Sequence, residues 1–161
     1  VNTMKSFAFA GLTALALADK GSFPRDDSFH ADCHVSAQFD GVSCDSLYAL
    51  MDAEIRSWNS DTTSPAQGVY NLKEESVDDY IWSTRLTKNQ KYTDDQLFEF
   101  SSNDTGCAVT GRSRSQSMSY YDYSVNFCNL WNVYNGLNLT SYSVGKCGYP
   151  AKDPASTCAK Y

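Results

Sequence analysis

Residues 107–119, CAVTGRSRSQSMS, alternate along the chain with a period of two. Successive side chains of an extended strand point to opposite faces, so Arg112 and Arg114 share one face and three small residues share the other. The small residues are Gly111, Ser113 and Ser115. We therefore predict a strand of an antiparallel sheet here. Its arginines form a polar stripe, and its small residues leave room for a bulky neighbour.

An arginine–serine repeat is also typical of RNA-processing factors, and the composition argues against that interpretation. The chain has 161 residues, a formal net charge of -6 and a sequence pI of about 4.7. Nucleic-acid binders usually carry a basic stripe that dominates their affinity for phosphate. The repeat is also short, and the aromatic residues Tyr120 and Tyr121 follow it closely. We therefore expect a folded domain without a nucleic-acid partner.

A helix is predicted directly after this strand, over residues 123–137. Four large side chains recur three or four residues apart and form one apolar face. They are Phe127, Leu130, Trp131 and Tyr134. Asp122 or Ser124 can accept hydrogen bonds from the first turn, and Gly136 is a plausible stop.

The chain before residue 107 predicts one more helix and several strands. Residues 44–58 place Leu47, Leu50, Met51, Ile55 and Trp58 on one helical face. Alternation indicates a short strand at residues 34–39 and further strands within residues 68–73, 77–85 and 95–100. The order predicts an α+β fold, in which a curved antiparallel sheet of about four strands packs against two helices.

The N-terminal residues 1–18 are predicted to be upstream residues and a secretory signal peptide. FAFAGLTALALA, residues 7–18, is an apolar run preceded by Lys5, with a small-x-small cleavage pattern at Ala16 and Ala18. A run of twelve is too short to span a bilayer, and the alternative is a buried helix. We expect residues 19–161 to form a single extracellular domain with an irregular N-terminal arm and a C-terminal strap.

Six cysteines agree with export: Cys33, Cys44, Cys107, Cys128, Cys147 and Cys158. An even number of cysteines in a secreted chain predicts disulfide bonds, although six cysteines allow 15 pairings. Sequential pairing, 33 with 44, 107 with 128 and 147 with 158, closes the smallest loops and is the expectation. Two sequons predict N-glycosylation at Asn103 and Asn138.

Three short motifs follow one another in the chain: Asp94 and Asp95, then Arg112, Ser113 and Ser115, then Asp122 and Asn126. Together they resemble a family of domains of unknown function that is known from bacteria and plastids. Its members carry a strand F-V-D-D-V-x-F, a strand R-S-x-S-R and a helix start D-x-G-x-N, in that order. Gln116 replaces the second arginine and Ser124 replaces the glycine. The resemblance implies an exported, cysteine-stapled eukaryotic relative with a similar fold, and it implies no activity.

These motif residues have a structural and a functional interpretation. Asp94 and Asp95 could pair with Arg112 and Arg114 across the sheet, either to hold strand register or to clamp a polar ligand. Structure is the favoured interpretation, and Asp122 and Asn126 are expected to cap the last helix.

Catalytic and metal sites are not predicted. Adjacent aspartates such as Asp94 and Asp95 point to opposite strand faces, so they do not form the aligned acid–base pair of a glycosidase. His30 and His34 are four residues apart and could bind a metal on a helix, but their stretch is not convincingly helical and Cys33 is expected to be oxidised. We therefore expect no metal, no cofactor and no catalytic residue.

Aromatic residues make up 14% of the chain and suggest a ligand pocket between sheet and helices. The candidate lining residues are Tyr80, Trp82, Phe98, Phe100, Tyr120, Tyr121, Phe127 and Trp131. The alternatives are that they fill the core, or that the tyrosines form an exposed patch for protein or sugar. The leading hypothesis is a secreted non-enzymatic domain that binds a small apolar or amphipathic ligand. The second is an extracellular structural or self-assembling interaction protein, and the third is a hydrolase.

Overall fold

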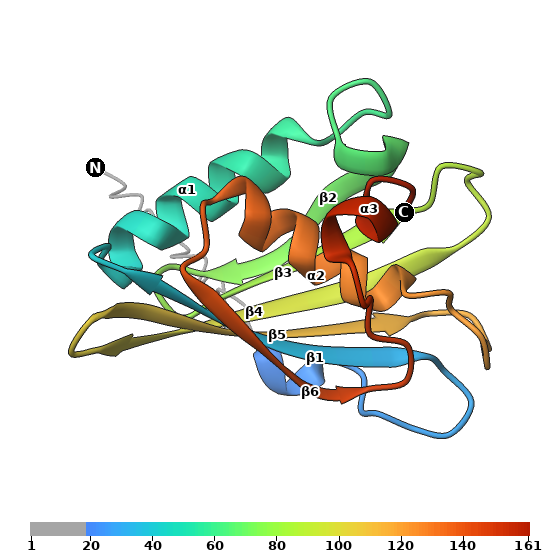
Figure 1. Cartoon of the computed structure of the whole chain (residues 1–161), viewed down its shortest axis with the longest axis horizontal. Coiled ribbons are helices and arrows are strands. Elements are labelled where there is room, and N and C mark those ends of the chain that lie inside the picture. The colour runs from blue at the N-terminus through green and yellow to red at the C-terminus, as the bar shows by residue number, and fades with distance from the viewer. Residues whose placement is uncertain (1–18) are drawn as a thin grey trace, which may run out of the picture.

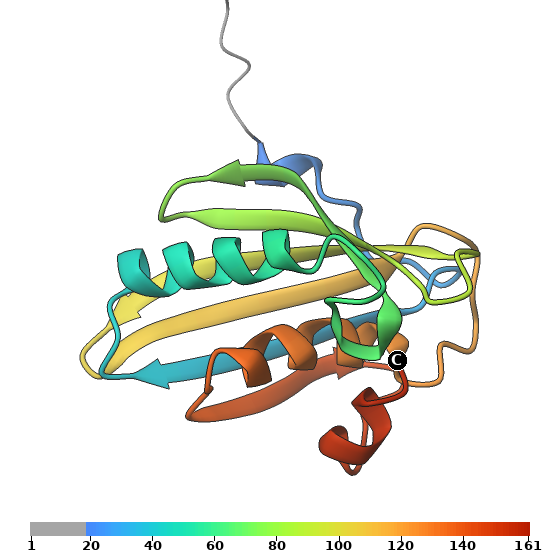
Figure 2. The ribbon, with the colours of Figure 1, turned by 90° about the horizontal axis from the view of Figure 1, so that it is seen from above.

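A six-stranded antiparallel sheet carries two helices on one of its faces in the computed structural model, which describes residues 19–161 (Figures 1 and 2). The predicted signal segment, residues 1–18, lies outside the described residues. The strands are β1 (Asp32–Asp40), β2 (Val69–Ser76), β3 (Tyr80–Leu86), β4 (Thr93–Asn103), β5 (Gly106–Ser115) and β6 (Ser141–Cys147). The helices are α1 (Cys44–Ser57), α2 (Val125–Gly136) and α3 (Pro154–Cys158), and short 3-10 turns lie at Lys20–Ser22 and Pro65–Gln67.

The strands lie in the order β2-β3-β4-β5-β1-β6, so the first strand of the chain is inserted between the fifth and the sixth. The prediction of an α+β fold with an antiparallel sheet is confirmed, and the predicted number of about four strands is wrong. The tail expected to be an irregular strap contains β6 and the short helix α3. β6 is an edge strand whose first six residues are exposed, so it lacks the apolar alternation by which a strand is recognised.

The two predicted helices begin where polar side chains can accept their first amide hydrogens. The Ser43 hydroxyl accepts a hydrogen bond from the backbone N–H of Ser46 at the start of α1. Asp122 caps α2 in the same way, because its carboxylate accepts a hydrogen bond from the backbone N–H of Asn126. Ser124 makes no side-chain cap and has a left-handed backbone with φ of 72°.

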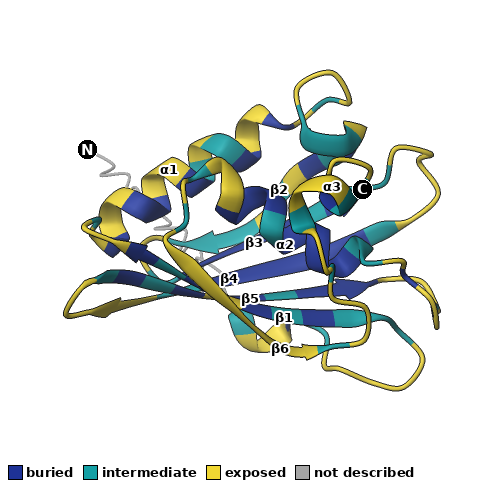
Figure 3. Cartoon of the chain, in the orientation of Figure 1, coloured by how far each residue is buried: buried dark blue, intermediate teal, exposed yellow. Residues whose placement is uncertain are grey.

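The main core lies between the sheet and the helices α1 and α2 (Figure 3). The prediction for α1 holds for four of its five positions, and Leu50 is instead 55% exposed. On β5 the predicted small residue Gly111 lies beneath α2. A Cβ atom there would come too close to the Tyr134 hydroxyl and would lie 3.1 Å from Leu130. The small face of β5 thus lets α2 approach the sheet closely.

The N-terminal arm, residues 19–31, crosses the face of the sheet that α1 and α2 leave open (Figure 1). Phe23 on this arm is 4% exposed and packs edge-on against Trp82, with 5.2 Å between the ring centroids. The Arg112 guanidinium lies 4.9 Å from the centroid of the Phe23 ring. The arm is therefore packed on the sheet, although its polar sequence gave no periodic signal.

Three disulfides join elements that are distant in the chain: Cys33–Cys147, Cys44–Cys107 and Cys128–Cys158. The predicted sequential pairing is wrong, because strand order decides which cysteines meet. Cys33 on β1 lies directly opposite Cys147 on β6 in the sheet register. The prediction that all six cysteines form disulfides is confirmed.

Candidate functional site

Five of the motif residues meet in one buried hydrogen-bond network beneath α2. The Ser113 hydroxyl donates to Asn126 Oδ1 at 2.7 Å, and the Ser115 hydroxyl donates to Asp94 Oδ1 at 2.8 Å. The Asn126 amide donates to Ser115 Oγ at 3.1 Å and to Asp122 Oδ2 at 3.0 Å. Three stretches that are separate in the sequence therefore form one structural unit.

Two further members of this network, Asn129 and Arg85, were not singled out from the sequence. The Asn129 amide nitrogen donates to Asp94 Oδ2 at 2.9 Å and to Ser113 Oγ at 3.0 Å, and its oxygen accepts from Arg85 Nη1 at 3.1 Å. A signal was present, because Asn126 and Asn129 are three residues apart and share a helical face. Arg85 is the largest side chain buried below 2% exposure.

Burial decides what this network can do. Asp94 is 1% exposed, and desolvation raises the pKa of its carboxyl group although Asn129 and Ser115 donate to it. Asn126 and Asn129 are fully buried. A network closed to solvent positions strands and α2 rather than meeting a ligand. This placement agrees with the structural interpretation of the motif.

Asp95 lies on the opposite face of the sheet from Asp94. Its carboxylate accepts hydrogen bonds from Trp82 Nε1 at 2.8 Å, from Lys73 Nζ at 3.1 Å and from Gln116 Nε2 at 3.0 Å. Adjacent residues of a strand point to opposite faces, so this separation follows from the alternation.

The expected pairs of Asp94 and Asp95 with the two arginines of β5 do not form in the described residues. Arg114 Nη2 instead lies 2.7 Å from Asp27 Oδ2 of the arm, and Arg112 Nη2 lies 3.6 Å from Glu99 Oε2. The arm brings a carboxylate to Arg114 that the sequence order did not suggest.

The eight candidate lining residues do not surround one pocket, so the predicted arrangement is wrong. Phe98 and Phe127 are fully buried between sheet and helices, and Phe100 and Trp131 pack at the margin of the same core. Tyr80 and Trp82 lie on the opposite face beneath Phe23. Tyr120 and Tyr121 follow β5 and are 60% and 70% exposed. The four strand residues, Tyr80, Trp82, Phe98 and Phe100, therefore lie on two faces of the sheet. Tyr120 and Tyr121 belong to a loop.

Tyr120 and Tyr149 border a hollow of about 540 Å³, which we call the tyrosine hollow. It lies between the arm, the loop after β5 and the loop after β6. Its lining includes Asp26, His30, Asp32, Tyr120, Lys146 and Tyr149. The ring of Tyr121 lies 6.0 Å from that of Tyr149. A second hollow, of about 760 Å³ and lined mainly by residues 61–67 and Lys88, has no aromatic side chain in its lining.

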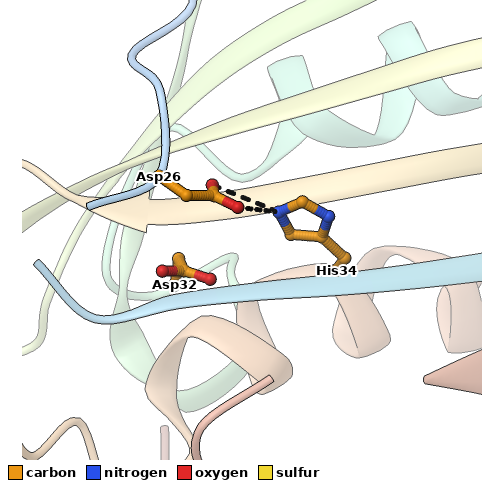
Figure 4. Close-up of side chains that lie close together, drawn as sticks. All are labelled: Asp26, Asp32 and His34. Atoms are coloured by element: carbon orange, nitrogen blue, oxygen red, sulfur yellow. Dashed lines mark hydrogen bonds and ion pairs between the residues drawn. The ribbon is translucent and has the colours of Figure 1, made fainter. Parts of the chain in front are cut away.

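Paired charges hold the arm side of the tyrosine hollow. Lys146 Nζ lies 3.1 Å from Asp26 Oδ2 and 2.9 Å from Asp32 Oδ2. His34 Nε2 lies 3.0 Å from Asp26 Oδ2 (Figure 4). Burial acts to raise the pKa of Asp26, but hydrogen bonds from Lys146 and His34 prevail and the pKa is lowered. Asp26 therefore remains a charged acceptor at neutral pH.

Asp27 is held in the ionised form in the same way. A hydrogen bond with His30 is the largest cause that lowers the pKa of this carboxyl group, and the backbone N–H of Phe29 and the Arg114 side chain add to it. His30 Nδ1 lies 2.9 Å from Asp27 Oδ1. Asp26 and Asp27 are thus acceptors of hydrogen bonds rather than proton donors.

The glycosylation sequons and the disulfides bear on the compartment. Asn103, beside the turn between β4 and β5, and Asn138, after α2, are both exposed. Three disulfides in a chain of this size indicate an oxidising compartment. Within residues 19–161, no helix combines the length and the apolar character needed to cross a membrane.

Comparisons of the chain with protein-family models, with curated proteins and with solved structures find no match. The resemblance to the bacterial and plastid domains of unknown function therefore stays a prediction.

Proposed function

We propose that the protein is a secreted, non-enzymatic domain that binds a small amphipathic ligand in the tyrosine hollow, and that the ligand is polyhydroxylated, like a saccharide. The observation that carries this proposal is the meeting of exposed tyrosine rings and ionised side chains in one hollow. The disulfides support export, because such bonds persist in oxidising compartments.

The two sides of the tyrosine hollow differ in chemistry. Tyr120 and Tyr149 offer apolar ring faces with a hydroxyl at the tip, while Asp26, His30 and Lys146 offer polar hydrogen-bonding groups. A saccharide has apolar C–H faces and a rim of hydroxyl groups, so it fits both sides.

The charge state of the carboxylates supports binding rather than catalysis. A general acid or base works best when its pKa lies near the operating pH. The pKa values of Asp26 and Asp27 are instead lowered, so both groups are ionised at neutral pH and accept hydrogen bonds from hydroxyl groups.

A saccharide array followed by titration calorimetry tests this function. Tyr149→Ala and Tyr120→Ala should each weaken binding about 10-fold, because stacking on an aromatic ring is lost. Tyr92→Ala is the matched control, since Tyr92 is 52% exposed but lies in the turn before β4. Failure of the native protein to bind any saccharide at millimolar concentration, or an equal loss in Tyr92→Ala, would overturn the proposal.

The edge strand β6 favours a second candidate, self-assembly. Among residues 19–161, β6 pairs only with β1, and Tyr142 and Val144 on it are 41% and 40% exposed. An open edge presents unpaired N–H and C=O groups to a second copy of the chain. Light scattering over a concentration series should then show dimers that Val144→Lys abolishes. A monomer at every concentration would contradict this candidate.

A further inference from the structure

Asp26, Asp32 and His34 bring three possible metal ligands together beside the tyrosine hollow (Figure 4). One ligand atom from each residue lies within 4.8 Å of the others. Asp32 and His34 are two residues apart on β1 and so share a face, and Asp26 comes from the arm that crosses this face. The disulfide Cys33–Cys147 joins β1, which carries Asp32 and His34, to β6, which carries Lys146.

The Asp32 carboxylate supplies an independent observation. Its side chain is 8% exposed, and its Oδ1 atom is buried without a hydrogen-bond partner in the described part of the chain. A buried carboxylate oxygen without a donor is unfavourable, and such atoms in folded proteins usually have a partner. Its twin, Oδ2, lies 2.9 Å from the Lys146 ammonium group, so the unpartnered oxygen belongs to the same cluster.

Lys146 shows where positive charge is favoured in this cluster. Its ammonium group lies within 3.1 Å of one oxygen of Asp26 and one of Asp32. The Lys146 side chain is 55% exposed, so it can turn into solvent at little cost. A cation that replaces it would meet two carboxylates and one imidazole nitrogen.

We infer that Asp26, Asp32 and His34 Nε2 form a binding site for a divalent transition-metal cation such as Zn²⁺, which displaces the Lys146 ammonium group. Zinc bonds of about 2.0–2.2 Å to nitrogen and oxygen place tetrahedral ligands about 3.4 Å apart. His34 Nε2 and Asp26 Oδ2 are already 3.0 Å apart. An imidazole ligand favours zinc over magnesium and calcium, which prefer oxygen ligands alone.

The site was not expected from the sequence, and it does not depend on the proposed saccharide function. The sequence interpretation paired His34 with His30 and required a helix. The structure places His34 on a strand, where its neighbours are the two aspartates, while His30 pairs with Asp27. The cation can be titrated without any other ligand, so the two proposals can fail separately.

Titration of the full chain with Zn²⁺ by calorimetry tests the site. Asp32→Asn and His34→Gln should each weaken Zn²⁺ binding at least 10-fold, because each removes a ligand or its charge. Lys146→Met should tighten binding several-fold, since it removes the competing cation and keeps the apolar stem. Mg²⁺ and Ca²⁺ should bind more weakly than Zn²⁺ to every one of these proteins.

His30→Gln and Asp45→Asn are matched controls and should keep the native affinity. The inference is overturned if neither the native chain nor Lys146→Met binds Zn²⁺. It is also overturned if binding survives both Asp32→Asn and His34→Gln, or if His30→Gln alone abolishes it. Circular dichroism of each variant separates loss of a metal ligand from loss of the fold. The tighter Zn²⁺ binding expected for Lys146→Met cannot result from unfolding, so it tests the site independently.

Discussion

Asn129 connects the buried Arg85 guanidinium to the buried carboxyl group of Asp94 through one amide group. Its oxygen accepts a hydrogen bond from Arg85, and its nitrogen donates to Asp94. Taking charges out of water is costly unless other groups satisfy them, and breaking one link leaves the remaining charge uncompensated. At the scale of single residues, this amide is therefore the link whose loss should affect the network most.

Asn129→Ala should lower the free energy of unfolding by about 2–4 kcal/mol, because the buried Arg85 guanidinium and the buried Asp94 carboxyl group each lose a hydrogen-bond partner. Urea unfolding followed by circular dichroism measures the change. Asn135→Ala is the control on the same helix, since Asn135 is exposed. Equal effects of the two substitutions would show that the network contributes no more than the helix surface.

Glu54 on α1 makes stability depend on pH. Burial raises the pKa of its carboxyl group to about 7, and the carboxylate packs closely against Gly136. The unfolded value is about 4.3, so the folded state binds the proton more tightly. The stability that this proton contributes is complete below about pH 4 and is lost as the pH rises through 7.

Glu54→Gln should therefore raise the melting temperature at pH 8 relative to the native chain and change it little at pH 4. Thermal unfolding at the two pH values checks this. Asp61→Asn, which neutralises an exposed carboxylate in a loop, should show no such difference. A native-like fall in stability between pH 4 and 8 in Glu54→Gln would contradict the assignment to this residue.

At the scale of elements, the arm covers part of the sheet face opposite α1 and α2. Phe23, Tyr80, Trp82 and Leu97 form a small apolar cluster that is separate from the main core. Because α1 and α2 occupy only one face, this cluster would meet water without the arm. The residues of the arm also supply Asp26 and Asp27 to the tyrosine hollow.

Phe23→Ala should lower the free energy of unfolding by about 3 kcal/mol, the usual effect of truncating a buried phenylalanine. It should also shift the tryptophan fluorescence to longer wavelength, because Trp82, which is 3% exposed, loses its cover. Phe29→Ala is the control within the arm, since Phe29 is 54% exposed. An unchanged emission spectrum would mean that the arm does not cover Trp82.

At the scale of the whole molecule, the three disulfides cross-link elements that are far apart in the chain: β1 with β6, α1 with β5, and α2 with α3. Their partners are 114, 63 and 30 residues apart in the sequence. Cross-links that close long loops restrict the unfolded chain most, in the chain-entropy account of disulfides. The bond between β1 and β6 therefore has the largest expected effect.

Peptide mapping of the oxidised protein should recover these three pairs. Replacing Cys33 and Cys147 together by alanine should destabilise the fold by about 5 kcal/mol, against about 4 kcal/mol for Cys128 and Cys158. Denaturant unfolding of the two double variants measures the difference. Recovery of the sequential pairs instead would contradict the register of β1 with β6.

The candidate sites could be predicted only in part from the sequence. The motif residues Asp94, Ser113 and Asn126 were singled out, and the structure joins them in one network. Asn129 and Arg85 were missed because a buried polar side chain in a strand or helix looks like a solvated one until its neighbours are known. The tyrosine hollow is formed by the arm, the loop after β5 and the loop after β6. No local sequence pattern predicts that these three segments lie side by side.

The sequence by itself determined the two main helices, most strands and which side chains of one strand share a face. These follow from periods of two and of 3.6, which are properties of the local backbone. Only the tertiary structure decided that β1 lies between β5 and β6, and with it the disulfide pairs, the strand β6 and the approach of Asp26 to His34. Periodicity determines the direction of a side chain, whereas its partner depends on strand order, which long-range packing sets.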